Sequence, residues 1–384
     1  MTSNPHFFIL GYFGWYNVGD DAIGLSVIKE LKNRYPDAKL LVTCQDRYFL
    51  ENFHGTNISQ DLEIIGFKIL KILRGIFKSR HFIITGGTHF HDEDGLFFTR
   101  LKILLSFVMI TTYARILNKP PLLLGHGIGP LSSSWSKALV KVILLNSKKI
   151  FVRDEDSFRL VTMLGFGDKC IQGFDCAILL IKEGSVLEEI SDYHYNKKII
   201  GISLLPVYGI YSNDFEKDVQ IVKSFAKCLG SMLKKDNSIN LRLFAFRAGT
   251  RHSDVPLLIS LMNNINAHSD SIELIQYEGN IEKFLKSING CDLSIGMRYH
   301  ASVFAYFLHK PQIILDYMGK CKSLGRDIGI NEMAIVPVSD ILTPSFCSKI
   351  QSFISNPVHN MANLPIHSAK MRAVMMFDKL EEQL

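Results

Sequence analysis

The sequence lacks the features that mark several classes of protein. Its seven cysteines form no C-x-x-C pair and their number is odd, which argues against a disulfide framework or a zinc site and favours a reducing compartment. The start, Met1–Pro5, has neither the basic residues nor the apolar stretch of a signal peptide. The most apolar segment, Ile103–Thr112, is too short to span a bilayer and predicts a buried helix. We therefore expect a cytoplasmic protein.

A large excess of one charge is also missing. The chain has 43 Lys and Arg against 37 Asp and Glu, a net charge of +6 over 384 residues. This mild basic excess does not indicate a nucleic-acid-binding protein, but it suits an anionic small molecule or an anionic membrane surface. The share of hydrophobic residues, 47%, is that of a globular protein, and the length predicts two or three domains.

What is present is a regular alternation of short apolar strands and helical stretches, interrupted once by the polar stretch Glu183–Lys198. Such an alternation predicts right-handed βαβ units and parallel sheets. We expect an α/β protein of two Rossmann-like, doubly wound domains, residues 1–182 and 199–360, with a C-terminal helix at 361–384. The predicted strands are His6–Leu10, Leu40–Thr43, Phe82–Thr85, Pro121–Leu124 and Ile150–Val152, then Ile199–Leu204, Leu241–Phe246, Ile272–Gln276, Leu293–Ile295 and Pro311–Leu315.

Ligands of such sheets bind outside the carboxyl ends of the strands, and the unusual motifs follow the predicted strands. Glycines there let the backbone approach a ligand closely. The alternative for each motif is an ordinary connection, with residues such as Asp20 or Asp154 capping the next helix. The motifs are Gly11–Asp21, Thr85–Gly95, Gly125–Leu131, Val152–Ser157 and Gly296–Ala301.

Two of these motifs have a clear chemical interpretation. In Thr85–Gly95, adjacent glycines suit an anion-binding loop, and the His and acidic residues behind them are of types that bind metals. A solvated acidic loop is the commoner outcome, so we predict no metal site. In Gly296–Ala301, Arg298 and His300 open a helix, which predicts an anion site with a proton donor beside it. The alternative for His300 is a buried side chain that ties two loops together.

In this order the motifs resemble the polysaccharide pyruvyltransferase family. The resemblance implies two Rossmann-like domains that face a cleft, as in B-type glycosyltransferases, with the acceptor on the N-terminal and the donor on the C-terminal side. It implies transfer of pyruvate from phosphoenolpyruvate, without a further cofactor, to two hydroxyls of a polysaccharide or lipid-linked glycan as a ketal. The matching residues are Asn17–Asp21, Gly86-Gly87, Gly125–Pro130, Val152–Ser157, Phe174–Ala177, Gly296–Ala301, Tyr317 and Lys320.

The donor's carboxylate and phosphate need fixed positive charge, and its methylene carbon needs a proton donor. We assign the two-pronged anion contact to Arg298 and the general acid to His300. Asp20 is the second predicted catalytic residue. The further donor contacts are Arg247, Lys320 and the backbone at Gly127, and the acceptor contacts are Asn17, Asp21, Gly87, His89 and His126.

Two departures from the family pattern leave alternatives open. Many members carry an Arg after the first strand of the second domain, where this chain has Ser203–Val207. Arg247 or Arg251 is the candidate replacement. Without one, either the donor differs or the activity is lost, which would leave an inactive sugar- or anion-binding relative. Thr88 replaces a third glycine, which bears on the acceptor. A B-type glycosyltransferase with a nucleotide-sugar donor is the other alternative, with Glu273 and Glu278 as ribose partners.

The sequence also leaves a contact with a membrane as an alternative. Lys68, Lys71, Arg74 and Lys78 recur at helical spacing among apolar residues. A basic amphipathic helix lies on anionic bilayers, which would suit a lipid-linked acceptor at the inner face of the membrane. We favour the alternative, a docked helix with a solvated charged face.

Overall fold

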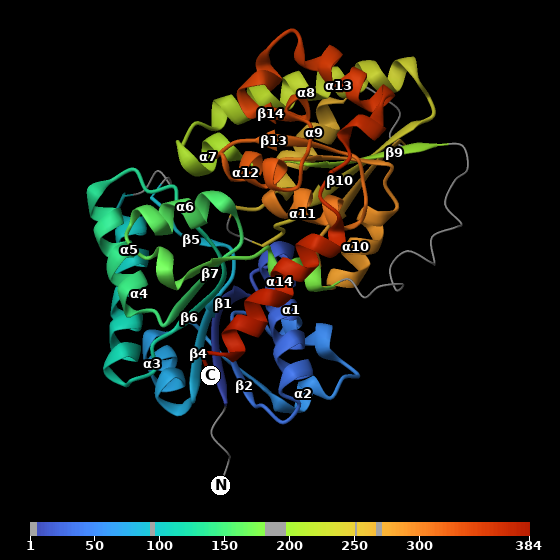
Figure 1. The fold of residues 1–384 in the computed structure, drawn as a ribbon. Coiled ribbons are helices and arrows are strands. Elements are labelled where there is room, and N and C mark those ends of the chain that lie inside the picture. Colours follow the sequence, from blue (N-terminus) through green and yellow to red (C-terminus); the bar gives the residue numbers. More distant parts are fainter. Residues whose placement is uncertain (1–5, 93–96, 181–196, 250–251, 266–270) are drawn as a thin grey trace. The chain divides into compact units, whose positions relative to one another are not determined.

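The computed structural model describes residues 6–92, 97–180, 197–249, 252–265 and 271–384. The chain forms two compact units, which are residues 1–180 with 367–384, and residues 181–366 (Figure 1). The predicted linker, Glu183–Lys198, lies almost wholly outside the described residues. Each unit is a parallel sheet with helices on its faces, so the predicted doubly wound α/β class is confirmed.

The sheet of the first unit has the strand order β3-β2-β1-β4-β6-β7-β8, with β5 paired to β6. All of its pairings are parallel. The strand order changes direction between β1 and β4, which is where doubly wound sheets bind ligands. The strands are β1 (Phe7–Phe13), β2 (Leu40–Cys44), β3 (Leu62–Ile65), β4 (His81–Thr85), β5 (Thr88–Phe90), β6 (Leu122–Ile128), β7 (Lys149–Val152) and β8 (Cys170–Gln172).

The helices of this unit pack on the two faces of its sheet. Four of them contribute side chains to one continuous apolar core: α3 (Ile69–Lys78), α4 (Phe97–Ile116), α5 (Ser134–Asn146) and α6 (Glu155–Met163). Figure 1 shows α3, α4 and α5 on one side of the sheet and α1 (Val18–Arg34) on the other. A short helix, α2 (Ile58–Asp61), precedes β3.

The second unit repeats the design, with the order β11-β10-β9-β12-β13-β14 and parallel pairing throughout. Its direction changes between β9 and β12, beside the Arg298 motif. The strands are β9 (Lys198–Ser203), β10 (Ile239–Ala245), β11 (Ile272–Gln276), β12 (Leu293–Gly296), β13 (Gln312–Asp316) and β14 (Ile335–Pro337). The helices are α7 (Val207–Tyr211), α8 (Phe215–Lys235), α9 (Val255–Asn264), α10 (Ile281–Asn289), α11 (Tyr299–Phe307), α12 (Lys320–Asp327) and α13 (Phe346–Ser355).

Two local expectations are wrong. The glycine-rich stretch from Gly125 to Ile128, expected as a loop, belongs to β6, and β5 forms within a segment also expected as a loop. The pairing of Thr88 with Gly127 continues the ladder. Gly127 permits this approach because a Cβ atom there would lie 2.8 Å from Thr88 Oγ1.

The expected buried helix at Ile103–Thr112 also needs correction. It is part of the longer helix α4, and only 28% of the most apolar stretch of α4 is buried. Leu104, Phe107 and Ile110 belong to the core, whereas Leu105 and Met109 are exposed. Among the described residues, α4 is the one helix long and apolar enough to cross a membrane.

The C-terminal helix α14 (Ile366–Glu381) packs on the first unit. Arg34 of α1 forms ion pairs with Asp378 at 2.8 Å and Glu381 at 3.3 Å. Arg372 donates a hydrogen bond to the carbonyl of Gly173. The helix is therefore part of that unit, although about 190 residues separate it along the chain from the rest of the unit.

Phe377 tests the contribution of α14 to the stability of the first unit. The side chain of Phe377 is fully buried, so Phe377→Ala should lower the free energy of unfolding by about 3–5 kcal/mol. Met371 of the same helix is 54% exposed, and Met371→Ala should change it by about 0.5 kcal/mol or less. Chemical denaturation of both variants measures the difference. Equal effects would mean that α14 does not pack as described.

Candidate functional site

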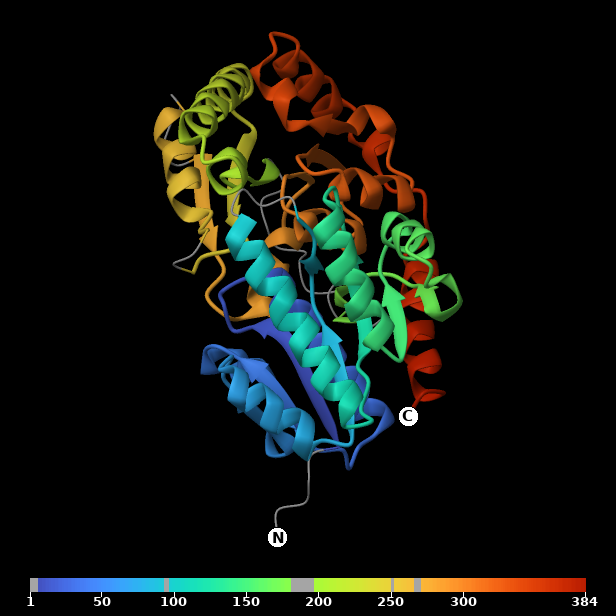
Figure 2. The ribbon, with the colours of Figure 1, turned by 90° about the vertical axis from the view of Figure 1, so that its left-hand side faces the viewer.

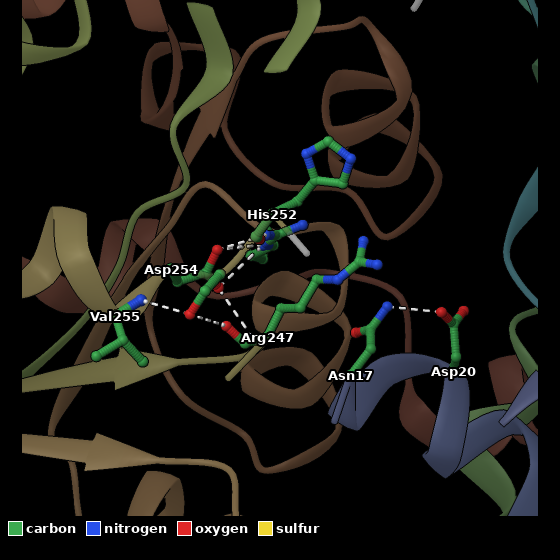
Figure 3. A network of polar contacts seen from close by, with 8 residues as sticks. Asn17, Asp20, Arg247, His252, Asp254 and Val255 are labelled. Atoms are coloured by element: carbon green, nitrogen blue, oxygen red, sulfur yellow. Dashed lines mark hydrogen bonds and ion pairs between the residues drawn. The ribbon is translucent and has the colours of Figure 1, made fainter. Parts of the chain in front are cut away.

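The loop after β1 brings two of the predicted acceptor-side residues together. Asn17 Nδ2 donates a hydrogen bond of 2.6 Å to Asp20 Oδ2 (Figure 3). Asp20 Oδ1 faces Gly87, where an added Cβ would lie 3.1 Å from it. Asp20 is partly exposed. The pair therefore lies at the switch point between β1 and β4, and its carboxylate is oriented by the Asn17 amide.

Asp21 has a different environment from Asp20. Its side chain is fully buried, and it accepts hydrogen bonds from Gly14 N at 2.8 Å and from the Tyr48 hydroxyl at 2.7 Å. These contacts hold the β1–α1 turn to the segment that follows β2. Asp21 thus shapes the loop from inside and does not present its carboxylate to solvent, contrary to the expectation of an acceptor contact.

A buried arginine links the loops after β4 and β7. Arg153 forms an ion pair of 2.9 Å with the buried Asp175 and donates a hydrogen bond of 3.1 Å to Thr88 Oγ1. Asp154 accepts a hydrogen bond from Ser157 N at 2.8 Å, which confirms its predicted capping of α6. Thr88, which replaces a glycine of the family pattern, therefore has a structural role beside Gly127. A glycine at this position would leave the Arg153 guanidinium without that partner.

The two predicted acceptor histidines are neighbours in the first unit, and His89 is partly exposed. His126 is fully buried, and its Nε2 donates to the carbonyl of Ile84 at 3.1 Å. Burial lowers the pKa of His126 to about 4, and burial together with His126 lowers that of His89 well below its usual value. The ring of His89 lies 4.8 Å from Tyr12 and 5.5 Å from His126. Both imidazoles are therefore neutral near neutral pH, and neither is a cationic ligand for an acceptor.

Asp92, in the segment considered for metal binding, caps a helix instead. Its carboxylate accepts hydrogen bonds from Ser132 and Ser133 N and from the Ser132 and Ser136 hydroxyls, at the start of α5. Burial alone would raise the pKa of Asp92, but these hydrogen bonds lower it to about 2. Within the described ranges, no group of three potential metal ligands is close enough to hold an ion. Glu93 and Asp94 lie outside those ranges.

The capping role of Asp92 predicts a defined dependence of stability on pH. Asp92→Ala should lower the free energy of unfolding by about 1–2 kcal/mol near neutral pH. Because the folded-state pKa is depressed from 3.8 to about 2, the carboxylate stabilises the fold above this range, and the difference should vanish as the pH falls through it. Denaturant titrations across that range measure it. Asp156→Ala, at an exposed position in the first turn of α6, is the control and should change stability by about 0.5 kcal/mol or less.

In the second unit, Asp254 organises both predicted donor-binding arginines. Its carboxylate is fully buried and forms an ion pair with Arg298, whose Nε and Nη2 both contact it. The backbone N of Arg247 donates to Asp254 Oδ2 at 3.0 Å, and Asp254 N donates to the Arg247 carbonyl at 2.8 Å (Figure 3). Burial raises the pKa of Asp254, and the facing Arg298 opposes that rise. The carboxylate therefore fixes Arg298 against the end of β10.

This arrangement changes the two-pronged anion contact that was expected of the Arg298 guanidinium. One edge of the guanidinium, Nε with Nη2, is already occupied by Asp254 and by the carbonyl of His252. Nη1 makes no hydrogen bond within the described part of the chain. Arg298 thus offers a single nitrogen, not a two-pronged fork, to a ligand. Sequence reasoning missed Asp254. Its place directly before α9 is typical of a capping residue, but its carboxylate makes no capping hydrogen bond to that helix.

A group of tyrosines and a lysine lies around Arg298. The rings of Tyr211 and Tyr317 are 5.8 Å apart, and Lys320 Nζ is 5.2 Å from the Tyr317 ring. Burial raises the pKa of Tyr211 to about 12, Tyr317 adds to this, and Lys320 and Arg298 oppose it. Burial also raises the pKa of Tyr317, so both phenols stay protonated as hydrogen-bond donors. His300 is half-buried in the first turn of α11, and its ring centre lies 5.4 Å from that of Tyr299 and 5.9 Å from that of Phe304. Sequence reasoning did not find Tyr211.

The remaining candidates have these positions. The Ser203 carbonyl accepts a hydrogen bond from Met297 N, which joins the end of β9 to the Arg298 loop. Glu273 pairs with Arg242 at 2.9 Å, and Glu278 lies 3.6 Å from Lys283, so both proposed ribose partners are in ion pairs. Arg251 lies outside the described residues.

Comparison with known proteins identifies the family. The model of the family described as polysaccharide pyruvyl transferase matches residues 17–318. The chain belongs to the polysaccharide pyruvyl transferase family. The family predicted from the order of the motifs is therefore confirmed. The chain is also similar to the amylovoran biosynthesis protein AmsJ of Erwinia amylovora, with 19% identity over 249 residues, which cover 63% of this chain and 60% of AmsJ.

Solved structures show what fold this pyruvyl transferase family member shares with other proteins. A putative UDP-N-acetylglucosamine 2-epimerase from Listeria monocytogenes has a TM-score of 0.63 and 11% identity, covering 98% of this chain and 96% of its own. HepE of Anabaena, solved with UDP-glucose, has a TM-score of 0.61 and 15% identity, covering 98% of both chains. Identities this low establish the fold alone. The predicted likeness to B-type glycosyltransferases in fold is thus confirmed.

Proposed function

We propose that this protein transfers pyruvate from phosphoenolpyruvate to two hydroxyls of a glycan and forms a pyruvate ketal. Two findings support the proposal, the family to which the chain belongs and the group of Arg298, Lys320, Tyr211 and Tyr317 in the second unit. The observation on which it chiefly rests is the buried Asp254, which holds Arg298 in one orientation at the start of α11. A positioned guanidinium, an ammonium and two protonated phenols suit a small, multiply charged anion.

Each step of the proposed reaction can be assigned to one of these groups or to His300. A proton adds to the methylene carbon of the donor, and the resulting cationic centre accepts one sugar hydroxyl. Loss of phosphate then lets the second hydroxyl add. One hydroxyl proton replaces the proton consumed and the other leaves with phosphate, so no oxidation or reduction occurs and no further cofactor is needed. We assign the first proton to His300, and the phosphate and carboxylate contacts to Arg298, Arg247 and Lys320.

On the acceptor side, we propose Asp20 as the base that takes a proton from a sugar hydroxyl. Asn17 orients this carboxylate. Aromatic side chains lie beside it: Tyr12 and Phe67 have ring centres 5.4 Å apart, and Trp15 and Phe67 have centres 5.7 Å apart. Burial raises the pKa of Tyr12, Arg100 opposes the rise and Asp20 adds to it. Apolar ring faces with a few fixed polar groups are typical of small-molecule sites and suit a sugar ring.

We also propose that the protein works in the cytoplasm. All seven cysteines are free thiols and six of them are buried, which suits a reducing compartment. The acceptor in this proposal is a polysaccharide or a lipid-linked glycan, in keeping with the biosynthetic role named for AmsJ.

The donor assignment is tested by calorimetry with phosphoenolpyruvate. Arg298→Ala should abolish measurable binding, because the charge-assisted contact is lost. That variant alone leaves the Asp254 carboxylate buried and unpaired, which destabilises proteins. The double variant Arg298→Ala/Asp254→Asn removes both charges, so it should keep the melting temperature near that of the wild type while still failing to bind.

Arg242→Ala is the control for this experiment. Arg242 is also paired with a carboxylate in the second unit, but on β10 and away from its end. The Arg242→Ala variant should bind phosphoenolpyruvate with the affinity of the wild type. Normal affinity in the double variant would reject the assignment of Arg298 to the donor.

The proton-donor assignment is tested by His300→Asn. This variant should keep most donor affinity and lose about 10²–10⁴-fold in maximal rate, the usual contribution of general acid catalysis. His309→Asn is the control: it removes an exposed imidazole just beyond α11, at a φ of 53° that Asn tolerates. An unchanged maximal rate in His300→Asn would leave His300 as a binding residue only.

A further inference from the structure

Three neighbouring helices of the first unit share an unusual distribution of charge. No acidic residue occurs between Glu63 and Asp92 or from residue 97 to Arg153, two segments that contain all of α3, α4 and α5. The other long helices of this unit, α1, α6 and α14, each carry Asp or Glu. The exposed basic side chains of the three helices include Lys71, Arg74, Lys78, Lys102, Lys137 and Lys141. We call the outer surface of α3, α4 and α5 the α3–α4–α5 face.

The same face exposes large apolar side chains. Phe98 is 81% exposed and Phe77 65% exposed. On α4 the exposed positions follow a helical repeat, and Phe98, Leu101, Leu105 and Met109 line a shallow open groove with Lys102 and Ser106. Leu70 on α3 and Leu145 on α5 extend the apolar surface to both neighbours. Exposed apolar patches of this kind mark interaction sites.

The three helices lie side by side on one face of the sheet (Figures 1 and 2). The inner stripe of α4, with Leu104, Phe107 and Ile110, belongs to the core of the unit. A helix that packs one face into a sheet cannot place that face in lipid, so α4 lies on a surface rather than crossing a bilayer. A stripe that is apolar and basic, with no acidic residue, has the composition of helices that lie in the membrane interface.

We propose that the α3–α4–α5 face docks the protein on an anionic lipid bilayer. Charge complementarity selects this occupant: a face without carboxylates is attracted to anionic headgroups, and the apolar side chains between the basic ones enter the headgroup region. Among the described residues, no ion pair neutralises the six basic side chains of this face. The sequence indicated this only for the helix at Lys68–Lys78, and the structure extends the surface to two further helices.

Docking through this face has a consequence for the site. Helices that follow parallel strands begin at the carboxyl edge of the sheet, so the starts of α4 and α5 lie at the edge that carries Asn17 and Asp20. Phe107 of α4 also lies with its ring 5.9 Å from that of His89. A docked protein would hold the acceptor side of its first unit close to the headgroups. This deepens the proposed function, because an acceptor linked to lipid would be presented there.

Vesicle flotation tests the docking surface. The wild-type protein should float with phosphatidylcholine vesicles that contain phosphatidylglycerol at low salt, and much less with phosphatidylcholine alone or at high salt. Lys137→Glu/Lys141→Glu reverses two charges one helical turn apart on α5. Each lysine contributes roughly fivefold to the partitioning, so the double variant should weaken it more than about tenfold. Phe98→Ser should weaken it as well.

The matched control is Lys223→Glu/Lys227→Glu. These two lysines are likewise exposed and one turn apart, but on α8 in the second unit, so the control should float like the wild type. Met163→Ser, at an exposed apolar position on α6, is the control for Phe98→Ser.

Three outcomes would overturn the proposal. They are no flotation of the wild type at low salt, equal losses in the α5 and α8 variants, and a change of oligomeric mass in the α5 variant without loss of flotation. The last would assign the face to a second copy of the chain. Because flotation needs no turnover, its failure is distinguishable from failure of pyruvyl transfer, which donor calorimetry measures separately.

Discussion

The buried carboxylate of Asp254 is the constraint on which the candidate donor site depends. It lies at the start of α9, fully removed from solvent, and it contacts the Arg298 side chain and the Arg247 backbone together. Burial of a charge is costly unless a partner of opposite charge and hydrogen bonds surround it. Asp254 has both, so the loops after β10 and β12 are held in one arrangement. Without that carboxylate, the Arg298 guanidinium would keep, among the described residues, only its hydrogen bond to the carbonyl of His252.

The first unit also contains a buried ion pair that joins two loops, formed by different residues. Arg153 follows β7 and pairs with Asp175, which follows β8, and both side chains are buried. The guanidinium also reaches Thr88 at the start of β5. In each unit, a buried ion pair thus joins connections that follow different strands at the carboxyl edge of the sheet. This edge is where doubly wound folds bind ligands, so both pairs position the loops that we assign to substrates.

The two units differ in the charge they offer. The first unit has neutral histidines, a carboxylate oriented by an amide, and aromatic rings near the β1–β4 switch point. The second unit has an arginine, a lysine and protonated phenols around the start of α11. These two environments suit the neutral sugar and the multiply charged donor of the proposed function. The division of roles between the domains, implied by the family resemblance, stays a prediction.

Much of this protein could be predicted from its sequence, because the strand and helix patterns are local. The alternation of apolar strands and helices, the motifs at strand ends and the capping of α6 by Asp154 depend on residues close together in the chain. The tertiary structure alone decided the pairing of Asp254 with Arg298, 44 positions apart, and the capping of α5 by Asp92, about 40 residues earlier. It also decided which histidines lose their charge by burial, how far β6 extends, and which stripe of α4 stays exposed. These features depend on long-range contacts and on exclusion of water, which form only when distant segments pack together.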